Sequence, residues 1–111
     1  MNILFIMCDQ LRADYLSCYG HPHLNTRNID MLASRGVRFN NAYCQAPLCG
    51  PSRASFYTGR YMSSHGVMGN GDPLKMGELT LGDYLRSMGM IAVVVGKSEG
   101  SPNFAALDKF D

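Results

Sequence analysis

Two short apolar runs, one near each end of the chain, constrain the fold most strongly. Residues 2–8 are nearly continuously apolar and stop at Asp9, and residues 90–95 are apolar throughout and stop at Gly96-Lys97. Apolar runs of this length, without alternating polar residues, are typical of strands buried on both faces of a parallel sheet. Both runs are far shorter than the roughly 20 residues that span a membrane.

Helical patterns lie between these runs. Residues 26–36 carry apolar side chains at helical spacing and end at a glycine, which predicts a helix. Residues 80–88 open with Thr80 and Asp83 at the spacing of a capping box, which predicts another. A further helix is expected over residues 50–58, where a proline suits the first helical position.

The order of these elements predicts the fold class. Residues 37–43 can form a short strand, and the glycine-rich residues 59–78 are expected to form a loop. Strands alternating with helices predict an α/β fold with a parallel sheet and crossover helices. Ligands of such sheets bind beyond the carboxyl ends of the strands, so Asp9 and Lys97 are expected to converge on one edge.

Composition excludes several classes of function. The chain has 111 residues, is 46% hydrophobic, and carries a net charge of +1 without a charged block, so nothing indicates binding to nucleic acid or to a membrane. Cys8, Cys18, Cys44 and Cys49 lack the spacing of a zinc site, although a disulfide framework is possible by count. The start of the chain does not resemble a signal peptide, so a cytoplasmic location with free thiols is expected.

Residues 49–60, Cys-Gly-Pro-Ser-Arg-Ala-Ser-Phe-Tyr-Thr-Gly-Arg, carry the strongest functional signal. Cys49 precedes the expected helix start, where free N–H groups and the helix dipole favour negative charge. Arg53 falls within the first turns, near that thiol. A nucleophile beside an arginine suits an anionic substrate such as a sulfate or phosphate ester. From the residues alone, the alternative interpretation is a buried structural cysteine at a helix cap.

The same residues resemble the sulfatase signature, Cys-x-Pro-Ser-Arg followed by Thr-Gly-Arg. The resemblance extends over nearly the whole chain and is strongest to bacterial arylsulfatases, choline-sulfatase-like enzymes and phosphonate monoester hydrolases. It implies a parallel-sheet α/β sandwich of the sulfatase/alkaline-phosphatase type. Residues 1–111 would form only the N-terminal part of the catalytic domain, with the C-terminal remainder of that domain absent.

The resemblance implies a hydrolase of sulfuric esters. In this family a maturation enzyme that reads Cys-x-Pro-x-Arg oxidises the cysteine to formylglycine (3-oxoalanine), so Cys49 is the expected modified and catalytic residue. One hydroxyl of the hydrated aldehyde attacks sulfur, and the other later loses its proton and expels sulfate. The expected partners are the formylglycine-generating enzyme and a small sulfate or phosphonate ester, and a homo-oligomer of the full-length parent is left open.

The resemblance also implies a divalent metal, Ca²⁺ or Mn²⁺, held by Asp9 and residue 49. Hard cations prefer carboxylate oxygens, and a metal can lower the pKa of bound water from about 15.7 to about 7. Gln10 follows where many sulfatases have a second aspartate, which resembles the phosphonate monoester hydrolase and choline sulfatase side. Asp9 and residue 49 fall short of the roughly six ligands of such a site. A turn or cap aspartate is the alternative for Asp9.

Three further roles follow from the resemblance. Arg53 would orient the formylglycine hydroxyls. Lys97 would be catalytic and bind a substrate oxygen, although Glu99 stands where the family usually has a histidine. Asn70 lies where phosphonate hydrolases carry an active-site asparagine, which predicts substrate binding. The alternatives are a solvated lysine and an ordinary loop asparagine, and His65 is predicted to be structural or gatekeeping.

Two classes of function therefore remain. The first is an enzyme that cleaves sulfate esters, with phosphonate or phosphate monoesters as the alternative substrates. Sulfate is favoured because residues 41–53 resemble the sulfatase branch, whereas Gln10 and Asn70 resemble the phosphonate branch. The second is a catalytically incomplete α/β fragment, because the 111 residues alone are expected to be inactive.

Overall fold

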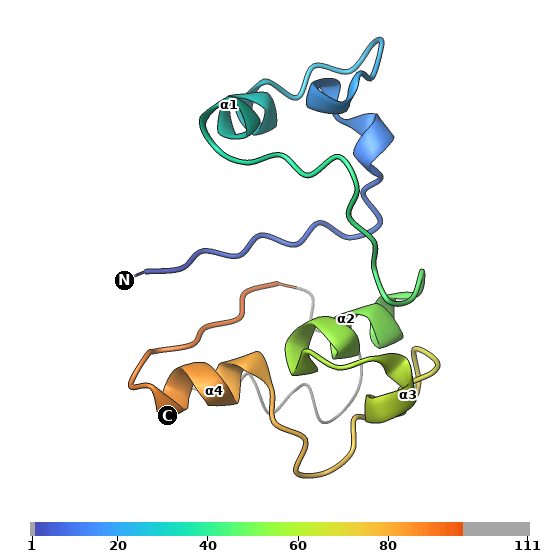
Figure 1. Ribbon diagram of the computed structural model, residues 1–111, viewed down its shortest axis with the longest axis vertical. Helices are drawn as coiled ribbons and strands as arrows, with labels where there is room; N and C mark the ends of the chain where they lie inside the picture. The colour runs from blue at the N-terminus through green and yellow to red at the C-terminus, as the bar shows by residue number, and fades with distance from the viewer. Residues whose placement is uncertain (1, 97–111) are drawn as a thin grey trace. The chain divides into compact units, whose positions relative to one another are not determined.

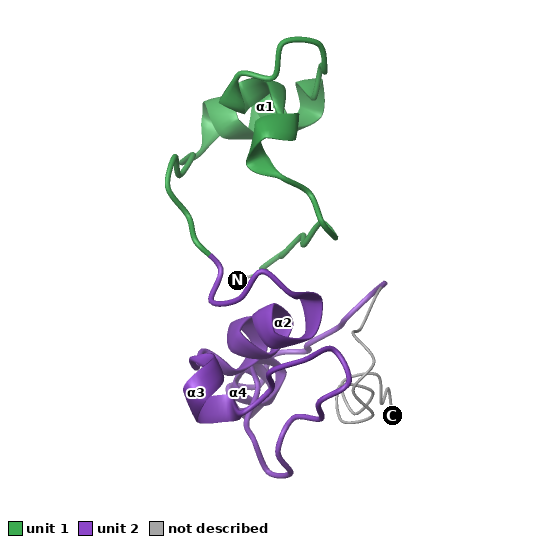
Figure 2. Cartoon of the chain, turned by 90° about the vertical axis from the view of Figure 1, so that its right-hand side faces the viewer, with its two compact units in different colours: residues 1–43 green, residues 44–111 purple. Residues whose placement is uncertain are grey.

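The computed structural model describes residues 2–96, and the chain divides into two compact units, Met1–Tyr43 and Cys44–Asp111 (Figures 1 and 2). All regular structure within the described residues is helical. The elements in chain order are η1 (Ala13–Tyr15), η2 (Ser17–Tyr19), α1 (Arg27–Arg35), α2 (Cys49–Thr58), α3 (Met62–His65) and α4 (Leu81–Ser87). None of these helices has both the length and the apolar character needed to cross a membrane.

The first unit is held together by a polar network around Asp30 of α1. The Asp30 carboxylate accepts hydrogen bonds from the hydroxyls of Ser17 (2.5 Å) and Thr26 (3.0 Å) and from the backbone N–H of Cys18 (2.9 Å). These donors, Ser17 first, lower the pKa of Asp30 because they stabilise its ionised form. The network joins η2 to the start of α1, which begins and ends as the sequence predicts.

The second unit packs α2 against α3 and α4. Its small core consists of Ala54, Val67 and Leu74, with Tyr57 packed against them. At the start of α4, Asp83 Oδ2 accepts hydrogen bonds from the backbone N–H (2.8 Å) and the hydroxyl (2.7 Å) of Thr80. The capping box that the sequence predicts is therefore formed.

The Thr-Gly-Arg part of the signature ends α2. The Thr58 hydroxyl donates to the carbonyl of Ala54 at 2.7 Å, and the N–H of Gly59 donates to the carbonyl of Ser55 at 2.9 Å. Gly59 has a φ of 67°, which glycine adopts without steric cost, so it stops the helix. Arg60 then pairs with Glu78, with 3.0 Å between Nε and Oε1.

The predicted strands over residues 2–8, 37–43 and 90–95 are not formed in the described part of the chain. Figure 1 shows residues 2–8 as an extended segment, and their side chains are exposed, Leu4 by 85%. Ile91, in the last run, is 92% exposed. An apolar run becomes a strand only when its backbone N–H and C=O groups meet those of a neighbouring segment. The described residues supply no such neighbour, so the predicted parallel sheet is missing from them.

Two smaller predictions about local structure also change. Residues 59–78 are not entirely loop, because α3 forms within them and ends at Gly66 with a φ of 76°. Pro51 is the third residue of α2 rather than the first, because the helix begins at Cys49. Proline is still tolerated there, since the first N–H groups of a helix have no partner within it.

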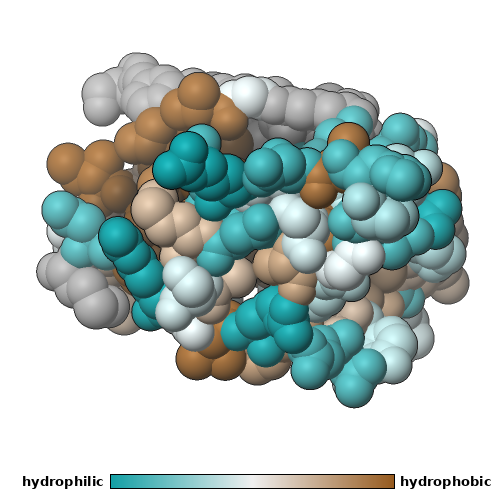
Figure 3. Space-filling view, turned by 90° about the horizontal axis from the view of Figure 1, so that it is seen from above, coloured by the Kyte–Doolittle hydropathy of each residue, from teal (hydrophilic) through white to brown (hydrophobic). Residues whose placement is uncertain are grey.

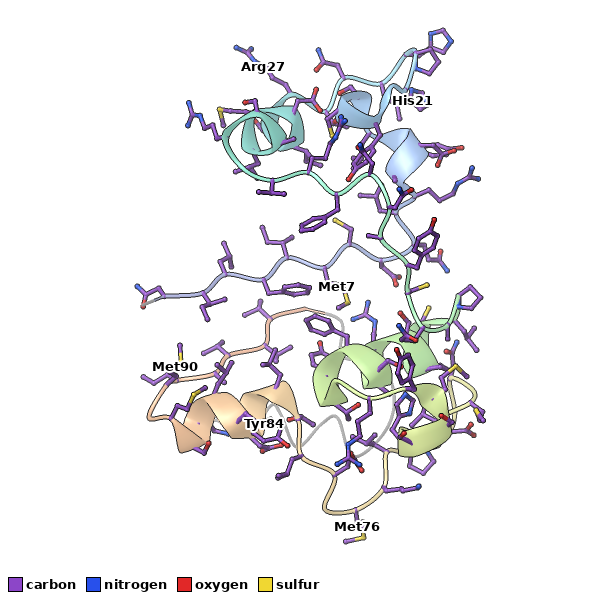
Figure 4. The ribbon with its side chains drawn as sticks, viewed as in Figure 1. Met7, His21, Arg27, Met76, Tyr84 and Met90 are labelled. Atoms are coloured by element: carbon purple, nitrogen blue, oxygen red, sulfur yellow. The ribbon has the colours of Figure 1, made fainter. Side chains whose placement is uncertain are left out.

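Apolar side chains remain on the surface of the described residues, where Figure 3 shows them in brown among hydrophilic ones in teal. Met76, labelled in Figure 4, points away from the second unit and is 95% exposed. Single exposed methionines are ordinary on protein surfaces. The exposed runs are different, because several large apolar side chains follow one another along the backbone.

Candidate functional site

The candidate site lies at the N-terminus of α2. Cys49 is the first helical residue and is partly exposed, and Leu48 before it provides no side-chain cap. The backbone N–H of Ser52 donates to the carbonyl of Leu48 at 3.0 Å, which closes the first turn. The N–H of Gly50 has no partner within the helix and instead donates to Oδ1 of Asn70 at 2.8 Å. Asn70 thus caps α2 from a loop twenty residues away.

Arg53 lies one turn after Cys49. Residues four positions apart in a helix start on the same face, so the thiol and the guanidinium occupy one side of α2. Arg53 is only 7% exposed and is engaged in interactions, as a buried guanidinium must be. Cys49 and Arg53 therefore both stand in the first turns of α2, and the role that the sequence assigns to them stays a prediction.

His65 is fully buried and fixes the opposite side of α2. Its Nδ1 accepts a hydrogen bond from the backbone N–H of Val67 at 3.1 Å, and its Nε2 lies 2.9 Å from the Ser55 hydroxyl. Because Nδ1 accepts, the neutral ring carries its proton on Nε2, and this N–H donates to the hydroxyl oxygen of Ser55. Burial lowers the pKa of His65, Glu78 raises it and Lys75 lowers it, with burial the largest cause.

We expect His65 to make the second unit less stable in acid. Its folded pKa lies below the ordinary value of 6.5, so the unfolded chain takes up this proton at higher pH than the folded chain. The stability from the neutral imidazole is therefore present above about pH 6.5 and is lost as the pH falls below it. Thermal unfolding followed between about pH 8 and pH 5 should show the loss. His65→Gln, which cannot titrate, should have a flatter pH dependence, and equal dependence in both proteins would contradict the assignment.

The predicted site residues are only partly brought together. Cys49, Arg53 and Asn70 lie in the second unit, whereas Asp9 belongs to the first unit and Lys97 lies outside the described residues. Asp9 stands at an exposed bend, and Gln10 after it has a φ of 53°, which is uncommon for a residue with a side chain. The sequence-based expectation that Asp9 and Lys97 converge on one sheet edge therefore stays a prediction.

A divalent cation would find few ligands in the described residues. Among residues 2–96, no three His, Cys, Asp or Glu side chains gather into a group that could hold a metal. The Asp9 carboxylate has the right chemistry for a hard cation, but one carboxylate and one oxygen at position 49 are too few for it. The residues that the structure describes do not by themselves fit a complete metal site.

The structure adds three residues that sequence reasoning missed. Ser55 binds His65, Gly50 contacts the loop that carries Asn70, and Asp72 orders that loop. The Gly-Asp-Pro sequence at 71–73 does indicate a turn. No local pattern, however, indicates which helix that turn would contact.

Comparison with known proteins places this chain in a family. A protein-family model described as Sulfatase matches residues 1–109. Arylsulfatase from Clostridium perfringens is 38% identical over 102 residues, covering 91% of this chain and 21% of that protein. Arylsulfatase A from Homo sapiens is 37% identical over 102 residues, covering 86% and 20%. The multifunctional alkaline phosphatase superfamily protein PehA from Trinickia caryophylli is 36% identical over 107 residues, covering 92% and 21%.

The chain therefore belongs to the sulfatase family, as the resemblance of its signature predicts. Membership implies the α/β fold of the alkaline phosphatase type, of which residues 2–96 show helices and no strand. The chain spans about a fifth of the length of these curated relatives.

Proposed function

We propose that these residues are the nucleophile-bearing part of an enzyme that hydrolyses sulfate esters. The observation that carries the proposal is the position of Cys49 at the first residue of α2, with Arg53 one turn along the same face. It is supported by membership of the sulfatase family and by relatives named arylsulfatases. A helix N-terminus with an adjacent guanidinium stabilises the negative charge of a sulfate group.

Cys49 would act after oxidation to formylglycine by a formylglycine-generating enzyme. Its aldehyde adds water to give two hydroxyls on one carbon. One hydroxyl oxygen attacks sulfur, the ester S–O bond breaks, and the alcohol leaves with a proton. The second hydroxyl then loses its proton, the C=O bond reforms, and the bond to the sulfate oxygen breaks, which releases sulfate and restores the aldehyde. The enzyme is thereby ready for another turnover.

The other predicted residues would support this chemistry. Arg53 would hold the oxygen atoms at position 49 by charge-assisted hydrogen bonds. Asn70 and Lys97 would bind the oxyanion of the substrate, and Asp9 would contribute one carboxylate to a Ca²⁺ or Mn²⁺ site. A bound divalent cation would lower the pKa of a hydroxyl group on residue 49. Its remaining ligands would have to come from outside residues 2–96, because these hold no further ligand group.

Phosphonate or phosphate monoester hydrolysis is the second candidate function. Gln10 and Asn70 favour it, as residues that resemble the phosphonate branch, and one relative is named a multifunctional alkaline phosphatase superfamily protein. Sulfate and phosphonate esters present similar tetrahedral oxyanions, so a cationic site does not separate them by charge type alone. Sulfate remains the preferred substrate class because more of the named relatives are sulfatases.

A kinetic comparison would decide between the two substrate classes. A full-length sulfatase that carries these residues is expected to have a higher kcat/KM for an aryl sulfate than for the matched aryl phosphonate monoester. Asp9→Ala should remove bound metal and nearly all turnover of both esters, whereas Asp14→Ala, which alters only an exposed pair with Arg12, should remove neither. A phosphonate rate far above the sulfate rate would overturn the sulfatase assignment.

The cellular setting is a further part of the proposal. We propose a reducing, cytoplasmic location, in which Cys8, Cys18 and Cys44 would stay as thiols. The partners would be the maturation enzyme and the ester substrate. A second copy of the full-length protein, in a homo-oligomer, would be a further partner.

A further inference from the structure

We propose that Asp72 and Gly50 are positioning residues that hold Asn70 against the first turn of α2, beside the nucleophile position. The inference deepens the proposed function. It rests on that function in one respect only, the role of residue 49 as the nucleophile. Neither residue would touch the substrate. Both would act through Asn70, by fixing where its amide lies and which of its two ends faces the site.

Asp72 orders the loop that carries Asn70. One oxygen of its carboxylate, Oδ2, accepts hydrogen bonds from the backbone N–H groups of Met68 (2.9 Å) and Gly69 (2.7 Å). The N–H of Asp72 in turn donates to the carbonyl of Gly69 at 3.2 Å, which closes the turn around Asn70. Hydrogen bonds to a charged acceptor are about twice as strong as neutral ones, so this turn is well defined.

Gly50 provides the space in which the loop meets the helix. A Cβ atom at position 50 would lie 3.0 Å from the Cα of Asn70 and 3.1 Å from the carbonyl oxygen of Gly69. Both neighbours are backbone atoms that a rotamer change cannot move. We therefore expect a larger residue to push the loop from α2 by a few tenths of an ångström and to weaken the 2.8 Å bond between the Gly50 N–H and Asn70 Oδ1. In this chain tertiary contact therefore favours glycine at the variable position of Cys-x-Pro-x-Arg.

The arrangement also selects one orientation of the Asn70 amide. Its oxygen accepts the Gly50 N–H, so its nitrogen, which only donates, is the end that would be offered to an anionic ligand. A pair of N–H donors beside position 49 suits the oxygens of a sulfate or phosphonate group. An asparagine in the opposite orientation would present an acceptor and repel them.

Hydrogen exchange in the full 111-residue chain tests this network without any need for turnover. Asp72→Ala and Gly50→Ala are each expected to speed exchange of the backbone amide at position 50 by about tenfold, the factor that corresponds to one lost hydrogen bond. Alanine favours helix more than glycine does, so a simple propensity effect of Gly50→Ala would slow exchange instead. Asp72→Asn should restore protection, because its amide oxygen can accept both N–H groups.

Matched variants separate positioning from general loss of structure. Gly71→Ala, where a Cβ meets nothing within 4 Å, and Asp83→Ala, which removes a similar carboxylate cap from α4, should leave position 50 unchanged. The alkylation rate of Cys49 can be measured against that of Cys44 by peptide mass. This ratio should change in Asp72→Ala and should return in Asp72→Asn to its value in the unsubstituted chain.

Two outcomes would overturn the inference: an unprotected Gly50 amide in the unsubstituted chain, or equal effects of Asp72→Ala and Asp83→Ala. Either result would leave the proposed function intact, because the kinetic comparison of esters tests that separately. Conversely, an enzyme that hydrolyses neither ester could still show the exchange pattern, which would refute the function alone.

Discussion

Co-expression with a formylglycine-generating enzyme is expected to convert Cys49, and no other cysteine, to the aldehyde. The reason is the Cys-x-Pro-x-Arg pattern, in which Pro51 and Arg53 stand two and four residues after Cys49. Cys44 is a control within the same chain, because its nearest proline, Pro47, stands three residues after it. Peptide mass spectrometry should show that the Cys49 peptide loses the mass difference between a thiol and an aldehyde. The mass of the Cys44 peptide should stay unchanged.

The conversion should take place before α2 folds. Pro51 and Arg53 are buried in the helix, so an enzyme that reads them has access only to an unfolded segment. A synthetic peptide of residues 41–60 should therefore be converted much faster than the purified, folded chain. Arg53→Ala in the peptide should slow the reaction. An unmodified Cys49 peptide, under conditions that convert an established control peptide, would refute the maturation proposal.

The purified 111-residue chain is expected to associate with itself, to bind divalent metal poorly and to hydrolyse no aryl sulfate. Its described residues offer too few oxygen ligands for a metal site. They also leave residues 2–8 exposed, together with Ile91, Val93 and Val95 of the last apolar run, and no strand pairs the backbone groups of either segment. Such segments bury their surface and satisfy their N–H and C=O groups by pairing with other chains.

Sedimentation at increasing protein concentration should reveal the association. Leu4→Lys and Ile91→Lys should each reduce it, because each places a charge within an exposed apolar run. Met76→Lys is the matched control: Met76 is at least as exposed, but it stands alone in a loop, so its substitution should change little. A monomeric, mass-verified chain that turns over an aryl sulfate would contradict the prediction, and would mean that these residues complete a site unaided.

Local sequence alone determined the signature and three of the helices, α1, α2 and α4, but not α3. The capping box at Thr80, the stop at Gly59 and the spacing of Cys49 and Arg53 all depend on residues within about one or two helical turns of each other. Such contacts are set by backbone geometry and side-chain chemistry, so they can be predicted without knowledge of the rest of the molecule. The family could be predicted for the same reason, because its signature is one continuous segment.

Tertiary structure alone decided the contacts between distant segments. The cap of Gly50 by Asn70 joins residues twenty apart, and the bond between Ser55 and His65 joins residues ten apart. Hydrophobic pattern indicates that a residue is buried or that a segment turns, but not which partner it meets. The same limit explains the predicted sheet: residues 2–8 have the composition of a strand, yet a strand exists only when a second backbone supplies its hydrogen bonds.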